Sequence, residues 1–222
     1  MNKQTKLQYI ILPGKTHKSV HVPNLMYSYS DLLVAKQTEL KGKNREEALF
    51  TLLKEGDDCL INRQLVDFLK LLKSGKAYDG NGKRINEKEL LSIYDKMTKA
   101  VSPFRAEWLG DSYIKINSGL YRGYNNCLVN KKVIATTFEK LEDYVTGNCF
   151  VDLNSFNYQG LPTRRSEKQE YEQGKNVYYW PPRDGFVVVF GAGSVWAFLG
   201  CGGDPTDTDA GLGVRRAKNF KG

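Results

Sequence analysis

The side chains that most often hold metals are sparse in this sequence. His17 and His21 are the only histidines, and the valine and proline residues around them favour an extended segment over the helix that would bring the two rings together. The four cysteines are far apart and form no CxxC pair, so reduced thiols are expected rather than a zinc site or a disulfide framework. These are Cys59, Cys127, Cys149 and Cys201. The sequence predicts neither a resident metal nor another cofactor.

Two glycine-containing segments imitate ligand-binding loops. Residues 79–90 begin like a calcium loop, but Arg84 replaces the central glycine and Leu90 stands where a bidentate glutamate belongs. Residues 187–200, VVVFGAGSVWAFLG, imitate a strand that leads into a dinucleotide-binding turn, yet Trp196 occupies the position of the third glycine. A GxSxG nucleophile motif is also absent. Because no catalytic constellation emerges, we expect a protein that is not an enzyme.

Composition and charge narrow the class of protein. The 222 residues carry a net charge of +8, and 41% are hydrophobic, which suffices to bury a core in a single domain, 1–222. Basic residues are interleaved with acidic ones, a pattern typical of a solvated surface, so nucleic-acid binding is not favoured. No apolar run is long enough for a membrane span or a signal peptide. The cytoplasm is the default location, and display on a virion or cell surface through a partner stays open.

The first half of the chain predicts one strand and three helices. Residues 7–12, LQYIIL, form a strand that ends at a Pro-Gly pair. Asn44 and Asn86 each stand three residues before a glutamate, which is the capping-box pattern, and each precedes an apolar repeat of helical spacing. A further helix covers residues 63–75 and stops at a glycine.

The second half is expected to contain β structure. The alternating residues around Asn117 indicate a hairpin, and after about Val145 no segment has a helical pattern. Short β-rich runs separated by glycine, asparagine and charged loops follow. Helices in the N-terminal half with irregular antiparallel β structure in the C-terminal half make the fold class α+β.

Period-two alternation marks residues 187–203 and separates two faces of an extended segment. The face expected to belong to the scaffold carries Phe190, Ala192, Ser194, Leu199 and Cys201. The opposite face carries Gly191, Gly193, Val195, Phe198, Gly200 and Gly202. Between Gly185 and Val214 there is also no Lys, Glu, Gln or Met, although lysine and glutamate are common elsewhere. Strand propensity alone does not explain this bias.

The C-terminal quarter, YYWPPRDGFVVVFGAGSVWAFLGCGGDPTDTDAGLGVRRAK, resembles the variable region of diversity-generating retroelement variable proteins. The frame expected there is W-x-x-R, F-x-A-x-S, L-x-C, P and LGVR. In this chain the frame corresponds to Trp180, Arg183, Phe190, Ala192, Ser194, Leu199, Cys201, Pro205, Leu212 and Val214. The rest of the chain is compatible with the same family but less specific.

The resemblance implies a C-type lectin fold of the formylglycine-generating-enzyme-like branch, in which strand 7–12 pairs with the closing strand VRRAKNF. It also implies that region 185–214 is diversified by copying a template repeat with errors at adenines, which cannot create Lys, Glu, Gln or Met from an asparagine codon. The function implied is binding of a protein or cell-surface ligand by an exposed surface. Its candidate residues are Phe186, Val188, Gly191, Gly193, Val195, Trp196, Phe198, Gly200, Gly202, Gly203, Asp204, Asp207 and Asp209.

Two other functions stay open at this point. A formylglycine-generating-like oxidase would bind copper through cysteines, but Cys201 falls in the scaffold alternation and matches no catalytic cysteine. A basic nucleic-acid-binding or virion structural protein would use the net positive charge. Within the favoured function, Trp196 and Phe198 are the expected apolar anchors for the ligand. The identity of the ligand and the oligomeric state are not specified by the sequence.

Overall fold

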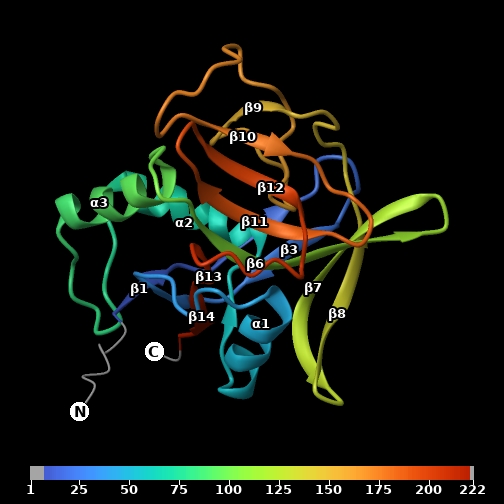
Figure 1. Cartoon of the computed structure of the whole chain (residues 1–222), viewed down its shortest axis with the longest axis horizontal. Coiled ribbons are helices and arrows are strands. Elements are labelled where there is room, and N and C mark those ends of the chain that lie inside the picture. Colours follow the sequence, from blue (N-terminus) through green and yellow to red (C-terminus); the bar gives the residue numbers. More distant parts are fainter. Residues whose placement is uncertain (1–7, 221–222) are drawn as a thin grey trace.

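The computed structural model describes residues 8–220 and has a mixed α+β fold (Figure 1). Within this range the helices are α1 (Arg45–Lys54), α2 (Asn62–Ser74) and α3 (Glu87–Thr98). All three lie in the first half of the chain, so the predicted α+β class and the placement of its helices are confirmed. None of these helices has both the length and the apolar composition that crossing a lipid bilayer requires.

The capping residues that the sequence predicts determine where the helices begin and end. The Oδ1 atom of Asn44 accepts a hydrogen bond from the Glu47 N–H at 2.9 Å, and Oδ1 of Asn86 accepts one from the Lys88 N–H at 2.8 Å. Gly75 ends α2 with a left-handed φ of 67°, a conformation that costs glycine little. The predicted starts of α1 and α3 and the predicted stop of α2 are therefore confirmed.

The large sheet has the strand order β8-β7-β6-β11-β12-β10-β9, and β13 pairs with β6. Its strands are β6 (Arg105–Ile116), β7 (Gly119–Val129), β8 (Lys132–Lys140), β9 (Cys149–Asp152), β10 (Asn176–Trp180), β11 (Val187–Ala192), β12 (Ala197–Gly203) and β13 (Leu212–Val214). The predicted hairpin is confirmed, with Asn117 at φ 54° in its turn. Strands β6, β7 and β8 contain 12, 11 and 9 residues, so this part is more regular than expected.

The smaller sheet combines both ends of the described chain in the order β1-β4-β14-β5. Its strands are β1 (Tyr9–Leu12), β4 (Leu32–Ala35), β14 (Arg216–Asn219) and β5 (Asp58–Cys59). A separate hairpin consists of β2 (Lys15–Lys18) and β3 (Met26–Tyr29).

The expected direct pairing of the first and last strands is wrong. Strand β4 lies between them: Ile10 of β1 pairs with Val34, and Val34 pairs on its other side with Ala217 of β14. Residues 32–35 read Leu-Leu-Val-Ala and are mostly buried, so this short apolar strand gains burial by taking the central place. The two terminal strands therefore share a sheet without touching through hydrogen bonds.

Two larger hydrophobic clusters hold the sheets and helices together, and a third, smaller one consists of Tyr27, Ile61, Tyr124 and Tyr158. The main cluster joins α2 and α3 to both sheets and includes Phe68, Ile93, Val34 and Phe190. The second cluster lies on the opposite side of β11, where α1, β6 and β13 meet, and includes Trp108. Figure 1 shows α1 below the large sheet, with the β7–β8 hairpin extending down beside it. Strand β11 is thus buried on both faces.

Candidate ligand-binding surface

Strand β12 has the alternation that the sequence predicts. Ala197, Leu199 and Cys201 are at most 2% exposed and belong to the main hydrophobic cluster. Phe198 and Gly202 point to the other face and are partly exposed. The predicted split into a scaffold face and an outward face therefore holds for Phe198 and Gly202. The expected exposure of Gly200 is wrong, because Gly200 is buried with the Trp180 ring 3.6 Å from its Cβ position.

Strand β11 also alternates, but its second face is not exposed. Phe190 and Ala192 pack in the main cluster as predicted, and Val188, expected on the recognition surface, lies there too with no exposed area. The other face, which carries Val189 and Gly191, is covered by the second cluster. The expected exposure of Val188 and Gly191 is wrong because β11 is a central strand, covered on both sides.

The turn between β11 and β12 projects four residues from the sheet. Ala192 pairs with Ala197, and the Gly193 N–H donates to the Trp196 carbonyl at 3.0 Å, which closes a two-residue turn. Ser194 and Val195 form its tip, and Val195 is 61% exposed. The expectation that Ser194 belongs to the buried face is wrong, since the alternation ends with β11.

A continuous row of aromatic rings, the aromatic strip, covers the outward face next to this turn. Trp196 stacks on Tyr178 with ring centroids 4.9 Å apart, and Tyr178 contacts Trp180 edge-on at 5.0 Å. Trp180 contacts Phe198 at 5.3 Å. Phe198 then stacks on Phe104, and Phe150 packs edge-on against Tyr178 and Trp196. The strip thus consists of Phe104, Phe150, Tyr178, Trp180, Trp196 and Phe198.

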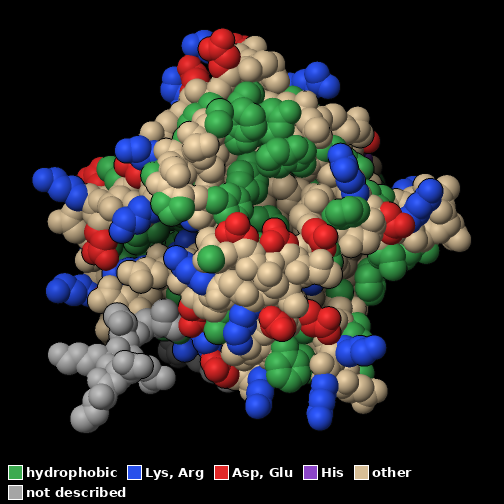
Figure 2. All heavy atoms as spheres, viewed as in Figure 1, with side chains coloured by type: hydrophobic (Ala, Val, Ile, Leu, Met, Phe, Trp, Pro, Cys, Tyr) green, Lys and Arg blue, Asp and Glu red, His purple; other side chains and the backbone are tan. Residues whose placement is uncertain are grey.

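The aromatic strip remains open to solvent although its rings touch. All its members are partly exposed except Phe150, which is 7% exposed. Parallel pairing of β10 with β12 places Tyr178 beside Phe198 and Trp180 beside Gly200. Figure 2 shows hydrophobic side chains gathered over this part of the sheet, with acidic side chains along the lower border. Aromatic rings left half-exposed in one contiguous patch are typical of an interaction site.

The glycines of the region fall into two groups by the room around them. A Cβ atom on Gly193 would have no heavy atom within 4 Å, and on Gly200 or Gly202 its nearest neighbour would be 3.6 Å away. On Gly191 it would lie 2.4 Å from the Ala106 Cβ and 2.5 Å from a backbone oxygen, and on Gly203 it would lie 2.6 Å from the Val189 side chain. Only the first group can accept larger side chains without moving the sheet.

The acidic candidates lie in the exposed loop after β12, where their carboxylates build turns. Oδ1 of Asp204 accepts from the N–H and hydroxyl of Thr206 at 2.9 and 2.7 Å. These hydrogen bonds lower the pKa of Asp204. Oδ1 of Asp207 accepts from the Asp209 N–H at 3.0 Å, and Oδ1 of Asp209 accepts from the N–H of Gly211 at 2.7 Å. Their local hydrogen bonds shape the loop at the border of the surface.

The remaining frame residues occupy different environments. Leu212 and Val214 are buried in the second cluster beside β6, as expected of scaffold. Pro205 is half-buried, and its carbonyl accepts from the first N–H of α1 at 3.1 Å. Arg183 is exposed, with its Cδ 3.6 Å from the Cβ position of Gly202, so it borders the surface instead of supporting it. Phe186, a candidate ligand contact, is half-buried just before β11.

The candidate metal ligands do not converge. Nε2 of His17 lies 2.6 Å from a carboxylate oxygen of Asp67, whereas His21 lies 3.7 Å from exposed Asp143. In residues 8–220 no three His, Cys, Asp or Glu side chains are grouped closely enough to hold a metal ion. Cys201 is fully buried in the main cluster, and burial raises the pKa of its thiol.

Three members of the aromatic strip were not identified from the sequence: Phe104, Phe150 and Tyr178. The expectation that Trp180 belongs to the scaffold is wrong, because its ring is half-exposed within the strip. Tyr178 alternates with Trp180 in the run YYW, a period-two signal that could have placed both rings on one face. Phe150 and Phe104 reach the strip through pairing of distant strands and through the loop before β6. No local pattern marks contacts of that kind.

The arrangement can bind a partner through an apolar, ring-lined surface with an acidic border. Comparison with known proteins found no relative of this chain. No family model matches the chain, and no curated protein and no solved structure matches it.

Proposed function

We propose that the chain is a non-enzymatic binding protein and that the aromatic strip is its recognition surface. The observation that carries the proposal is the contiguous row of partly exposed rings on β10, β12 and the β11–β12 turn. Tryptophan and tyrosine dominate the binding energy of protein interfaces because they bury a large area at a low entropic cost. The rings already pack against each other, so little ordering is needed on binding.

We further propose that the surface is diversified by a retroelement on a C-type lectin scaffold. The absence of Lys, Glu, Gln and Met between Gly185 and Val214 supports this. Gly193 and Gly202 are partly exposed beside the strip, and Gly200, although buried, has room for a Cβ atom beneath the Trp180 ring. The positions that can vary on this proposal are those three together with Val195, Trp196 and Phe198. Val188 is excluded because it packs in the main cluster, and Gly191 because a Cβ atom there would lie 2.4 Å from the Ala106 Cβ.

A copper oxidase is less well supported by the site. Its cysteine ligands would have to converge, but Cys59 belongs to the second hydrophobic cluster and Cys201 to the main one. Burial raises the pKa of both thiols, which disfavours the thiolate that a copper ion would bind. Ligand binding through the strip requires no such rearrangement.

Binding of the whole chain to an array of purified proteins and glycans tests the recognition surface. We expect the wild type to bind a defined ligand, and we expect Trp196→Ser with Phe198→Ser to weaken binding at least about tenfold, because such a loss equals that of one interface hot spot. A second variant, Gly193→Arg, adds a charged side chain at the edge of the strip without removing any packing, and it should weaken binding too.

The matched control is Ile134→Ser with Phe138→Ser. These two apolar residues are 41% and 48% exposed on β8, away from the strip. The control should bind like the wild type. Equal binding by the wild type, the strip variants and the control would reject the strip as the recognition surface.

A further inference from the structure

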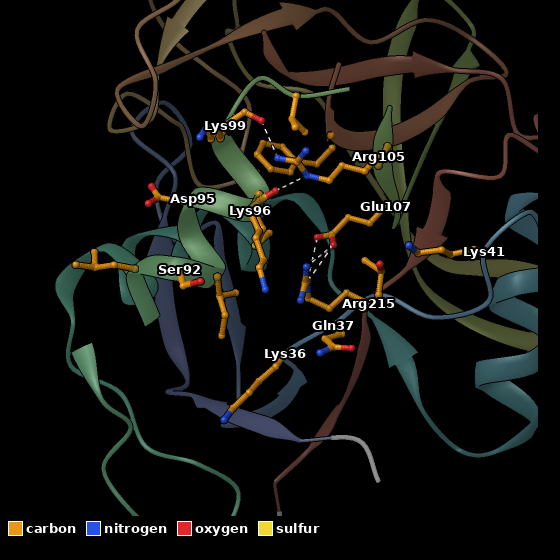
Figure 3. Close-up of a pocket in the computed structure, with 18 of the residues that line it drawn as sticks. Lys36, Gln37, Lys41, Ser92, Asp95, Lys96, Lys99, Arg105, Glu107 and Arg215 are labelled. Carbon is orange, nitrogen blue, oxygen red and sulfur yellow. Dashed lines mark hydrogen bonds and ion pairs between the residues drawn. The ribbon is translucent and has the colours of Figure 1, made fainter. Parts of the chain in front are cut away.

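A groove lies apart from the aromatic strip, between α3, the segment 36–41 and the adjoining ends of β6 and β11 (Figure 3). We call it the basic groove because lysine and arginine side chains line it. Its volume is about 800 Å³, within the range of sites that hold a whole small molecule. Ile93, Met97, Ala106 and Phe190 supply an apolar floor, and none of them is more than 8% exposed. The floor is therefore preformed by the hydrophobic core.

The side chains that line the basic groove carry a net positive charge. Seven basic and two acidic residues line it. Among residues 8–220 the structure contains no ion pair for the lining lysines Lys41, Lys88, Lys96 and Lys99. Figure 3 shows Lys96 and Lys41 approaching the groove from opposite sides. An anion between them would meet cations on two walls.

The negative groups of the groove are neutralised or turned away. Glu107 forms a buried ion pair with Arg215, with nitrogen–oxygen distances of 2.8 and 2.9 Å. Figure 3 shows the Asp95 carboxylate pointing away from this pair. The groove thus offers its lysines without a competing internal carboxylate.

The C-terminus of α3 would otherwise repel an anion, because its last carbonyls carry a partial negative charge. Arg105 covers them: its guanidinium donates to the carbonyls of Lys96 and Lys99 at 2.5 and 2.7 Å. The helix end therefore contributes a fixed cation to the wall of the groove instead of an exposed negative pole.

We propose that the basic groove binds a phosphorylated small molecule with an apolar or planar body, of the size of a nucleotide. The lysines on both walls contact the phosphates, and the core residues Met97 and Phe190 form the floor beneath the body. This site is independent of the aromatic strip and of the function proposed for it.

Calorimetric titration of the intact chain with ATP as the probe tests the proposal. We expect ATP to bind and adenosine to bind more weakly, because the lysines recognise phosphate. The double variant Lys41→Gln, Lys96→Gln should weaken ATP binding at least about tenfold, since two charge-assisted contacts are lost. Both lysines are exposed, so the variant should melt at the same temperature as the wild type.

The control, Lys132→Gln with Lys140→Gln, removes the same charge from exposed residues of β8. It should bind ATP within about twofold of the wild type, because a site effect depends on position and a general charge effect does not. No binding of ATP, or equal weakening in both double variants, would overturn the proposal. Tight binding of single-stranded DNA without binding of ATP would overturn it as well and indicate a nucleic-acid surface.

Discussion

Gly191 and Gly193 are two residues apart, yet they have opposite surroundings. Gly191 packs against Ala106 in the centre of the large sheet, and Gly193 opens the exposed turn after β11. At the residue scale this contrast separates fixed positions from changeable ones. Gly191 permits close approach of β6 and β11, whereas nothing near Gly193 requires a glycine.

The substitution Gly191→Ala should lower the free energy of unfolding by about 1–3 kcal/mol, because the added Cβ would have to displace the backbone of β6. Gly193→Ala is the matched control, and its stability should stay within about 0.5 kcal/mol of the wild type. Urea denaturation monitored by tryptophan fluorescence measures both. Equal stability of the two variants would show that the close contact between Gly191 and Ala106 does not restrict the size of the side chain at position 191.

Local signals in the sequence were enough for the helices and for β12. Asn44, Asn86 and Gly75 act through neighbours within four residues, so their roles could be predicted from the chain itself. The burial of the second face of β11 could not be predicted in this way. The elements that cover that face, α1 and β13, lie roughly 130 residues before β11 and roughly 20 residues after it in the sequence, beyond the reach of a local pattern. The same reason explains why Phe150 and Phe104 were missed.

At the scale of elements, the β2–β3 hairpin is attached to α2 by one buried carboxylate. Asp67 of α2 accepts from the Tyr29 hydroxyl at 2.7 Å and lies 2.6 Å from the ring nitrogen of His17. Arg63 pairs with it at 2.9 Å. Burial alone would raise the pKa of Asp67, but Arg63 and the Tyr29 hydrogen bond outweigh burial and hold it below its ordinary value.

Asp67→Asn should therefore destabilise the chain by about 3 kcal/mol at pH 7, since Arg63 loses its buried partner. A carboxyl whose pKa is depressed in the folded state stabilises it above the unfolded pKa of about 4 and loses this contribution as the pH falls. The difference between variant and wild type should accordingly shrink at pH 3.

Asp95→Asn is the control for this change because Asp95 is exposed and forms no ion pair among residues 8–220. Denaturation at the two pH values measures the effect. A loss of stability that is the same at pH 3 and pH 7 would indicate that the charge of Asp67 does not attach the hairpin.

At the scale of the whole molecule, Arg215 joins the two sheets. It pairs with Glu107 on β6 and donates to the Ala35 carbonyl on β4 at 2.9 Å. Arg215 is the last residue of the LGVR motif, and its buried side chain connects the two sheets beneath the basic groove. Phe198 and Gly202, on the outward face of β12, take no part in this connection, so substitutions there should leave the contact between the two sheets intact.

Sequencing the DNA that flanks the coding region tests most directly whether the outward surface is diversified. We predict a near-identical template repeat beside a reverse-transcriptase gene, with mismatches at adenines. The mismatches should affect the codons of Gly193, Val195, Trp196, Phe198, Gly200 and Gly202, and spare those of Val188 and Gly191. Absence of a repeat and of a reverse-transcriptase gene, or mismatches concentrated in the buried codons of β11, would contradict the account.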